Sequence, residues 1–290
     1  MSRPAFALNP VDFGLPSREQ LAAYRIWDSY YFPRTPAKPG AMIEDVATDL
    51  NDLEPFAIEK LCAYVHVGLG TLLPGGAVSP AEDPAQLHAL FERWRDRLLG
   101  VINVNANDVA ASLAALERWA KPGGPIVGVY FKSSKPGCLA CTHPNFDPIV
   151  RRCSELGLLI MQHTWFKAGG KDDPGESTPA ELADLARRHP TITFVSAHAG
   201  GDWERGIRAV RDCGNVYVET SGFNPTAGFV DMAVRELGAE RILYGGHLMS
   251  RSLSTELSKV LAADITDAQR KLIFGGNLRR LLARILPAAR

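Results

Sequence analysis

The stretch Leu158-Leu159-Ile160-Met161-Gln162-His163 is a short apolar run that ends in a histidine. Phe194-Val195-Ser196-Ala197-His198 and Leu243-Tyr244-Gly245-Gly246-His247 repeat this pattern farther along the chain. A parallel barrel gathers the ends of its strands at one rim, so three strands of this kind would bring three imidazoles to one cleft. The sequence therefore predicts a metal or substrate site formed by His163, His198 and His247.

Eight short apolar or β-branched runs alternate with segments whose apolar residues recur three and four positions apart. The eight runs are residues 26–32, 61–67, 98–104, 126–132, 158–163, 192–198, 216–220 and 241–246. Alternation of this kind implies parallel pairing with right-handed crossovers, and the nearly continuous apolar character fits strands buried on both faces. We expect an α/β fold with one distorted (β/α)8 TIM barrel over residues 26–290 and an N-terminal extension over residues 1–25. An open doubly wound sheet is the alternative.

Capping residues mark the ends of several expected helices. Thr178-Pro179-Ala180-Glu181 is a capping box with proline at the first helical position, and residues 266–269 repeat the capping pattern. Gly157 and Gly238 are placed to end helices before the next strand. The element boundaries therefore rest on more than periodicity.

Composition favours a soluble chain. The 290 residues contain 32 basic and 32 acidic side chains, and this balance gives no electrostatic argument for nucleic acid or a membrane surface. No apolar stretch approaches the roughly 20 residues that span a bilayer, and residues 1–7 lack the apolar core of an export signal. We expect a cytoplasmic protein, although a chain from which a signal had been removed would look the same.

Five cysteines are an odd number for a chain large enough to bury a core without covalent help, so a disulfide framework is not expected. Cys62, Cys153 and Cys213 lie on apolar patterns and are predicted to be small buried hydrophobes.

Phrases between Gly157 and Leu282 resemble the amidohydrolase-related superfamily, particularly its branch of metal-dependent hydrolases and decarboxylases. The matching phrases are Glu155-Leu156-Gly157-Leu158 before His163, His189-Pro190 before His198-Ala199-Gly200-Gly201, Arg241-Ile242-Leu243-Tyr244-Gly245-Gly246, and Gly276-Asn277-Leu278-Arg279-Arg280-Leu281-Leu282. The resemblance implies an active site at the carboxyl ends of the barrel strands, where a divalent metal activates water or polarises the substrate.

In the family pattern a His-x-His pair ends the first strand, single histidines end the fifth and sixth strands, and an aspartate ends the eighth. His163 and His198 match the two single histidines, whereas Tyr30 and Phe32 stand at the first-strand pair and His247 stands at the aspartate. Phenylalanine cannot bind a metal and neutral tyrosine is a poor zinc ligand. The chain therefore resembles a divergent member of the superfamily.

Three imidazoles are still the number found in three-histidine zinc sites, so we predict a divalent metal, with zinc as the first choice, held by His163, His198 and His247. Lys132 ends the fourth expected strand, where some relatives carry a carbamylated lysine ligand; the preferred interpretation is a lysine that fixes an anionic substrate. His247, His198 and Lys132 are the predicted catalytic residues, and Tyr30, Lys132 and Trp165 the predicted substrate contacts. Structural histidines without chemistry are the alternative.

The loop Gly137-Cys138-Leu139-Ala140-Cys141-Thr142-His143 carries ligand types for zinc or copper. A lone Cys-x-x-Cys is weak evidence, so ordinary loop cysteines are the preferred interpretation. A variant is that Cys141 or His143 replaces a missing first-strand ligand.

The remaining histidines and aromatic residues have plainer interpretations. His88 and His189 are expected to face solvent, and His66, at the end of the second strand, to be structural. Trp165, Trp203 and Phe223 follow three consecutive strands and either line a wall for a planar substrate or pack against helices.

We therefore predict an amidohydrolase-like enzyme that hydrolyses or decarboxylates a small organic acid, lactone or amide. The resemblance to the superfamily also allows a homodimer. The alternative is a metal-free barrel that has lost this chemistry and binds a ligand or partner. Histidine at position 247, rather than an inert residue, opposes that alternative.

Overall fold

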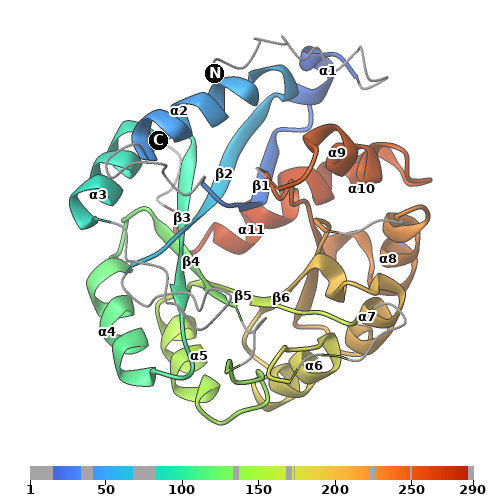
Figure 1. The fold of residues 1–290 in the computed structure, drawn as a ribbon. Helices are drawn as coiled ribbons and strands as arrows, with labels where there is room; N and C mark the ends of the chain where they lie inside the picture. The colour runs from blue at the N-terminus through green and yellow to red at the C-terminus, as the bar shows by residue number, and fades with distance from the viewer. Residues whose placement is uncertain are drawn as a thin grey trace.

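The computed structural model of the protein describes residues 16–33, 42–67, 83–132, 137–167, 172, 174–222, 226–248 and 250–286. Eight parallel strands follow one another around a barrel in chain order, with helices on the outside (Figure 1). The strands are β1 (Ile26–Tyr31), β2 (Ile58–Val65), β3 (Leu98–Val104), β4 (Ile126–Phe131), β5 (Leu159–His163), β6 (Phe194–Ala197), β7 (Val216–Glu219) and β8 (Ile242–Leu243). The predicted (β/α)8 barrel is confirmed.

Helices occupy the crossovers and the carboxyl end of the chain. They are α1 (Arg18–Ala22), α2 (Met42–Asp52), α3 (Pro84–Arg93), α4 (Val109–Trp119), α5 (Phe146–Glu155), α6 (Pro179–Arg188), α7 (Trp203–Val210), α8 (Phe229–Leu237), α9 (Leu253–Leu261), α10 (Asp267–Lys271) and α11 (Asn277–Leu282). Both predicted capping boxes are present, at Thr178 with Glu181 and at Thr266 with Gln269. Along this described part of the chain no helix has the length and apolarity needed to cross a membrane.

The barrel closes between β1 and the segment that follows β8. The backbone N–H and the hydroxyl of Ser29 both donate to the carbonyl of Tyr244, at 3.0 and 2.8 Å. A parallel bridge between Tyr31 and Leu248 continues this contact toward the carboxyl ends of the strands. The closure brings the rim residues of β1 and β8 side by side.

The last strand is shorter than the run at residues 241–246 predicts, because the backbone beyond Leu243 bonds elsewhere. Tyr244 N–H donates to the Ile273 carbonyl, at 3.0 Å. Gly245 N–H donates to Thr220 Oγ1, and Gly246 N–H donates to the buried Asp28 carboxylate. At the other side of the barrel β2 begins three residues before the predicted Leu61, since Ile58 already pairs with β1. The bonds made by Tyr244, Gly245 and Gly246 fix the backbone that places His247 at the rim.

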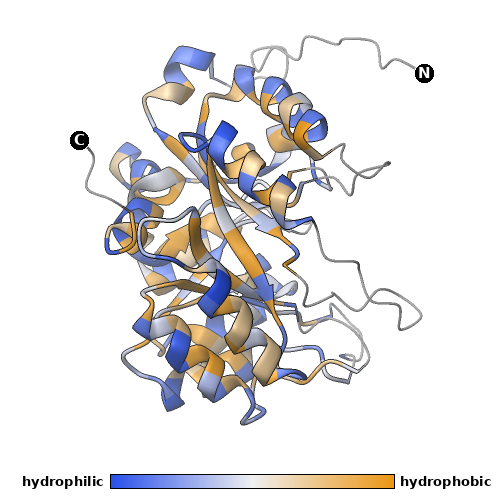
Figure 2. Ribbon diagram, turned by 90° about the vertical axis from the view of Figure 1, so that its left-hand side faces the viewer, coloured by the Kyte–Doolittle hydropathy of each residue, from blue (hydrophilic) through white to orange (hydrophobic). Residues whose placement is uncertain are grey.

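Two layers of apolar side chains hold the barrel together. One fills the space between strands and helices, and Figure 2 shows hydrophobic residues concentrated on the strands and the inward helix faces. The other fills the barrel interior and includes Tyr30, Tyr64 and Tyr130 with Leu278 and Leu282 of α11. The interior is therefore a packed core, and a ligand is confined to the rim.

The segment before β1 packs on the barrel through Leu21, which is fully buried. Cys62, Cys153 and Cys213 are free and buried, which confirms the prediction made for them.

Candidate active site

The three histidines of the apolar runs meet at the carboxyl-terminal rim of the barrel. His163 is the last residue of β5, His198 directly follows β6, and His247 lies four residues beyond β8. The ring centroids of His163 and His198 are 5.2 Å apart, and those of His198 and His247 are 5.1 Å apart. The arrangement of strand ends thus brings together residues that are 35 and 49 positions apart in the chain.

A cavity of about 300 Å³ lies beside these rings. It is lined by His163, Trp165, Glu176, His198, Gly222, His247 and Arg251. The Trp165 ring stacks on His163 with 15° between the planes and closes one side. This volume is at the lower end of the range for small-molecule sites, so the cavity suits a small substrate.

Burial keeps all three imidazoles neutral. It lowers the pKa of His163 to about 3, with a further contribution from the positive charge of Lys132. It lowers the pKa of His247 to about 4, and that of His198 well below its ordinary value. Near pH 7 each ring therefore has one N–H and one lone pair, which is the form that accepts a proton or binds a metal.

Two of the histidines have a backbone conformation that favours glycine. The φ angle is +63° at His198 and +43° at His247. A residue with a bulky side chain is uncommon in this region and is held there by its surroundings. At His198 the backbone N–H donates to the Glu219 carboxylate, at 3.1 Å. Such conformations collect at functional sites, and this pair lies at the cavity.

Buried carboxylates lie directly beneath the histidines, and sequence reasoning missed them. Glu219 ends β7, Asp28 lies within β1, and both side chains are fully buried. Burial raises the pKa of Glu219 to about 7 and that of Asp28 to about 8. An acidic residue inside an otherwise apolar strand run is the feature that could have revealed each of them.

The glycine pair before His247 is explained by these carboxylates. A Cβ atom on Gly245 would overlap Glu219 Oε1, and one on Gly246 would overlap Asp28 Oδ2. Side chains at these positions are therefore excluded by the packing of the strand ends. Two glycines in succession allow the backbone to pack against Glu219 and Asp28, and the next residue, His247, then lies at the rim.

The first-strand positions are filled by an aromatic cluster. Tyr30 is buried, and its hydroxyl bonds to that of Tyr130, at 2.8 Å. The Phe32 ring stacks on Tyr64, with centroids 4.7 Å apart. Tyr30 also contacts the His198 and His247 rings, at 4.8 and 4.7 Å between centroids. Tyr30 thus supports the histidines from below, and it is not among the residues that line the cavity.

Lys132 follows β4 near the same rim. Its ammonium lies 5.9 Å from the centre of the Phe32 ring. Its charge contributes to the lowered pKa of His66, His163 and His247. Lys132 is therefore close enough to influence the site electrostatically, although it is outside the cavity lining.

The three imidazoles have suitable chemistry for a metal but not a suitable arrangement. His163 Nδ1 is buried and has no hydrogen-bond partner among the described residues, as expected of a nitrogen that binds a ligand. However, the His198 and His247 rings are stacked with 29° between their planes, so their in-plane lone pairs do not converge. Within the described ranges no group of three or more His, Cys, Asp or Glu side chains is placed to hold one ion. As arranged, the residues do not fit a metal site.

The cysteine loop does not supply a replacement ligand. Cys141 is buried in the core, and its N–H donates to Ser177 Oγ, at 2.9 Å. Cys138 Sγ approaches the Lys132 carbonyl, at 3.6 Å, and His143 is exposed. Neither thiol is among the residues that line the cavity.

The other histidines and aromatic residues lie outside the cavity. His88 is exposed and stacks on Trp119, and the His66 ring bonds to Asn103. The prediction that His189 faces solvent is wrong, because its side chain is 10% exposed and bonds to Asp147 at 2.7 Å. Trp203 packs on Phe229 instead of forming a wall, whereas Phe223 lies outside the described residues.

A sequence profile of the amidohydrolase family matches residues 77–284, and the chain belongs to this family. A search of curated proteins gives no significant match. The family assignment agrees with the barrel and with the placement of His163 and His198 at strand ends.

Solved structures share the fold at low sequence identity. An uncharacterised TIM-barrel protein from Bordetella bronchiseptica has a TM-score of 0.69 and 17% identity, covering 90% of this chain and 99% of its own. A 2,6-dihydroxybenzoate decarboxylase from Rhizobium has a TM-score of 0.65 and 16% identity, with 89% and 98% coverage. A 5-carboxyvanillate decarboxylase from Novosphingobium aromaticivorans, complexed with manganese and 4-hydroxy-3-methoxy-5-nitrobenzoic acid, has a TM-score of 0.64 and 16% identity, with 90% and 97% coverage. At this identity the likeness shows the barrel.

Proposed function

We propose that the chain is an enzyme that hydrolyses or decarboxylates a small organic acid at the barrel rim by proton transfer through His198 and His247. The observation that carries this proposal is the convergence of three neutral imidazoles on one small cavity beside Arg251. Burial keeps these imidazoles neutral, so each ring has a lone pair that can accept a proton from a bound substrate or water. Family membership adds support, because amidohydrolases are named for bond hydrolysis.

A neutral imidazole has a definite task in either reaction. In hydrolysis its lone pair accepts a proton from the attacking water, and the imidazolium then returns that proton to the leaving group. In decarboxylation the carbon that loses carbon dioxide needs a proton, and the same ring delivers one taken from the substrate or from water. Two histidines in contact, His198 and His247, allow one ring to accept while the other donates.

Cationic side chains favour a carboxylate substrate. Arg251 lines the cavity, and its planar guanidinium is suited to bidentate carboxylate binding. Lys132 adds positive charge from the side of β4. Among the described lining residues the acidic one is Glu176, and its carboxylate lies 3.7 Å from the Lys167 ammonium. Benzoic acids with hydroxyl or methoxyl groups, the substrates named for the Rhizobium and Novosphingobium neighbours, are therefore the first compounds to try.

A divalent metal is the alternative route to the same bond cleavage. The manganese complex of one neighbour and the unpartnered Nδ1 of His163 favour it, whereas the stacked rings of His198 and His247 oppose it. The prediction of zinc has no separate support. Elemental analysis of the gently purified protein decides between these routes: about one equivalent of metal that is lost in His163→Ala supports the metal route.

Turnover of a panel of small carboxylic acids and lactones, followed as carbon dioxide or proton release, tests the proposed function. Turnover in the wild type that is abolished in His198→Asn supports it. A binding barrel without chemistry is the second candidate, favoured by Tyr30 and Phe32 at the first-strand positions. Saturable binding of a carboxylate without turnover, with or without added manganese or zinc, would establish that second candidate.

A further inference from the structure

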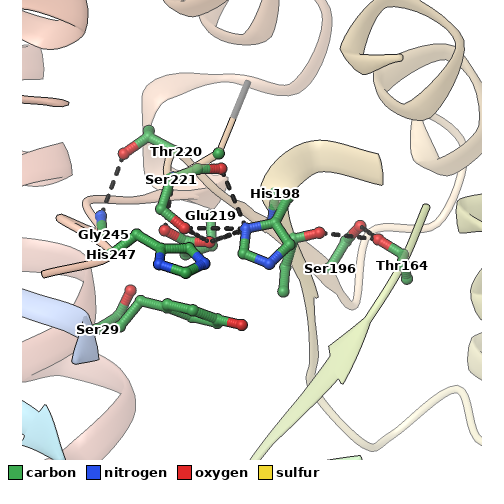
Figure 3. Close-up of polar contacts among 12 residues, drawn as sticks. Ser29, Thr164, Ser196, His198, Glu219, Thr220, Ser221, Gly245 and His247 are labelled. Carbon is green, nitrogen blue, oxygen red and sulfur yellow. Dashed lines mark hydrogen bonds and ion pairs between the residues drawn. The ribbon is translucent and has the colours of Figure 1, made fainter. Parts of the chain in front are cut away.

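Glu219 contacts His198 at both its backbone and its side chain. Glu219 Oε2 accepts the backbone N–H of His198 at 3.1 Å and lies 3.7 Å from His198 Nδ1. The same carboxylate accepts the N–H and the hydroxyl of Ser221, at 2.6 and 2.8 Å. Figure 3 shows Glu219 and Ser221 on one side of the His198 imidazole, joined to His198 by these contacts.

The atoms around His198 Nδ1 decide where its proton lies. The Ser221 carbonyl, at 3.2 Å, can only accept a hydrogen bond. The Ser221 hydroxyl, at 3.0 Å, already donates its proton to Glu219, so toward the imidazole it can only accept. Because the described atoms around Nδ1 all act as acceptors, Nδ1 carries the proton of the neutral ring. The lone pair is then on Nε2.

We infer that Glu219 and Ser221 are positioning residues that hold His198 as the Nδ1–H tautomer, with the Nε2 lone pair available to a ligand in the cavity. This deepens the proposed function, on which the catalytic use of that lone pair rests. A carboxylate that orients an imidazole and selects its tautomer is a general way to make a histidine an effective base. Without this role, a fully buried Glu219 would only cost the free energy of removing its carboxyl group from water.

The loop that carries Ser221 is itself fixed from behind. Lys259 is buried, and its ammonium donates to the carbonyls of Thr220 and Gly222, both at 3.2 Å. It also bonds to Glu256, at 2.6 Å. These bonds on either side of Ser221 fix its hydroxyl and carbonyl in position next to His198. A precisely held acceptor pair is what selection of one tautomer needs.

Nitrogen NMR of protein labelled with ¹⁵N-histidine tests the inference directly, because protonated and bare imidazole nitrogens resonate far apart. His198→Asn assigns the His198 signals among the seven histidines. We expect Nδ1–H and a bare Nε2 in the wild type at neutral pH. In Ser221→Ala and Glu219→Gln the tautomer ratio should shift toward Nε2–H by roughly tenfold, the effect of one buried hydrogen bond. Ser196→Ala is the matched control, since Ser196 is buried on β6 and bonds to Thr164.

Circular dichroism shows which variants fold, and either folded variant suffices for the measurement. An Nε2–H tautomer in the wild type overturns the inference. So does a ratio in both Ser221→Ala and Glu219→Gln that equals the ratio in Ser196→Ala. The measurement uses the resting protein, so a wild type with Nδ1–H and no turnover on any acid would overturn the proposed function and still support the tautomer assignment.

Discussion

The imidazole rings of His198 and His247 stack on each other, with centroids 5.1 Å apart and 29° between their planes. They come from opposite sides of β7, and both have a positive φ angle. Tyr30 contacts both rings from below, and the cavity lies beside them. The two histidines therefore form one unit rather than two independent side chains.

Loss of either ring should abolish most of the proposed activity. His198→Asn and His247→Asn keep a residue type that tolerates positive φ but remove the group that transfers the proton. We expect kcat to fall by about 10²- to 10⁴-fold in each variant, the usual contribution of a general acid or base. Steady-state kinetics measure this. His88→Asn, at an exposed position on α3, is the control and should keep full activity. Full activity in both rim variants would contradict the proton-transfer role.

Substitution of Arg251 should weaken substrate binding more than chemistry. Arg251→Gln removes the cation that lines the cavity, and we expect KM for a carboxylate substrate to rise about ten- to a hundredfold with a smaller effect on kcat. Arg251→Lys should recover part of the loss, because it keeps the charge without the planar fork. Arg208→Gln, on the exposed side of α7, provides the control. An unchanged KM in Arg251→Gln would show that the carboxylate binds elsewhere.

The barrel was predictable because most residues of its strands are apolar and buried. The eight runs and the capping boxes at Thr178 and Thr266 are local features, and local features are what a single sequence records. The end of β8 was misjudged because Tyr244, Gly245 and Gly246 look like strand residues. Their N–H groups bond instead to acceptors on other elements, and no local pattern encodes these partners.

The meeting of the three histidines was also predictable, since parallel strands gather their carboxyl ends. Arg251, Glu176 and Glu219 were not recognised as parts of the site. Arg251 and Glu176 lie on connections whose path depends on tertiary contacts, and Glu219 lies at a strand end whose side could not be assigned. The stacked rings of His198 and His247, which bear on the metal prediction, depend on side-chain angles that sequence spacing does not contain.

The Asp28 carboxyl should make stability depend on pH. Its folded-state pKa of about 8 is raised above the unfolded value near 3.9 by burial. The stabilising contribution of the neutral carboxyl is thus fully present below about pH 4 and is lost as pH rises through 8. Asp28→Asn is neutral at every pH and keeps an oxygen that can accept from Tyr30 and Gly246. It should gain stability relative to the wild type between pH 5 and pH 9, by on the order of 1–4 kcal/mol.

Urea unfolding of the two proteins at several pH values measures this difference. Glu219 and Glu256 also titrate with a raised pKa, but both are present in wild type and variant, so most of their contribution cancels. Asp184→Asn, at an exposed position on α6, should show no such trend. A constant difference between wild type and Asp28→Asn across this range would mean that Asp28 is ionised in the fold throughout.

Gly245 should be intolerant of a side chain because of Glu219. A methyl group at Gly245 would overlap Glu219 Oε1, which is fixed by the Ser221 N–H. We expect Gly245→Ala to lower the free energy of unfolding by about 1–3 kcal/mol, as over-packing of a dense core does. Gly214→Ala is the matched control, since a Cβ there meets no atom within 4 Å, and its effect should be small.

A double-mutant cycle separates this overlap from a general loss of glycine. Glu219→Ala removes the carboxylate that the new methyl group would meet, so Gly245→Ala should cost less in that background than in the wild type. Residues in contact commonly show coupling of about 0.5–3 kcal/mol, and a coupling in this range is the expected result. Strictly additive changes in the free energy of unfolding would show that Gly245→Ala causes no steric overlap with Glu219. Glu219 would then be able to move away, and its hold on His198 would be weaker than the hydrogen bonds indicate.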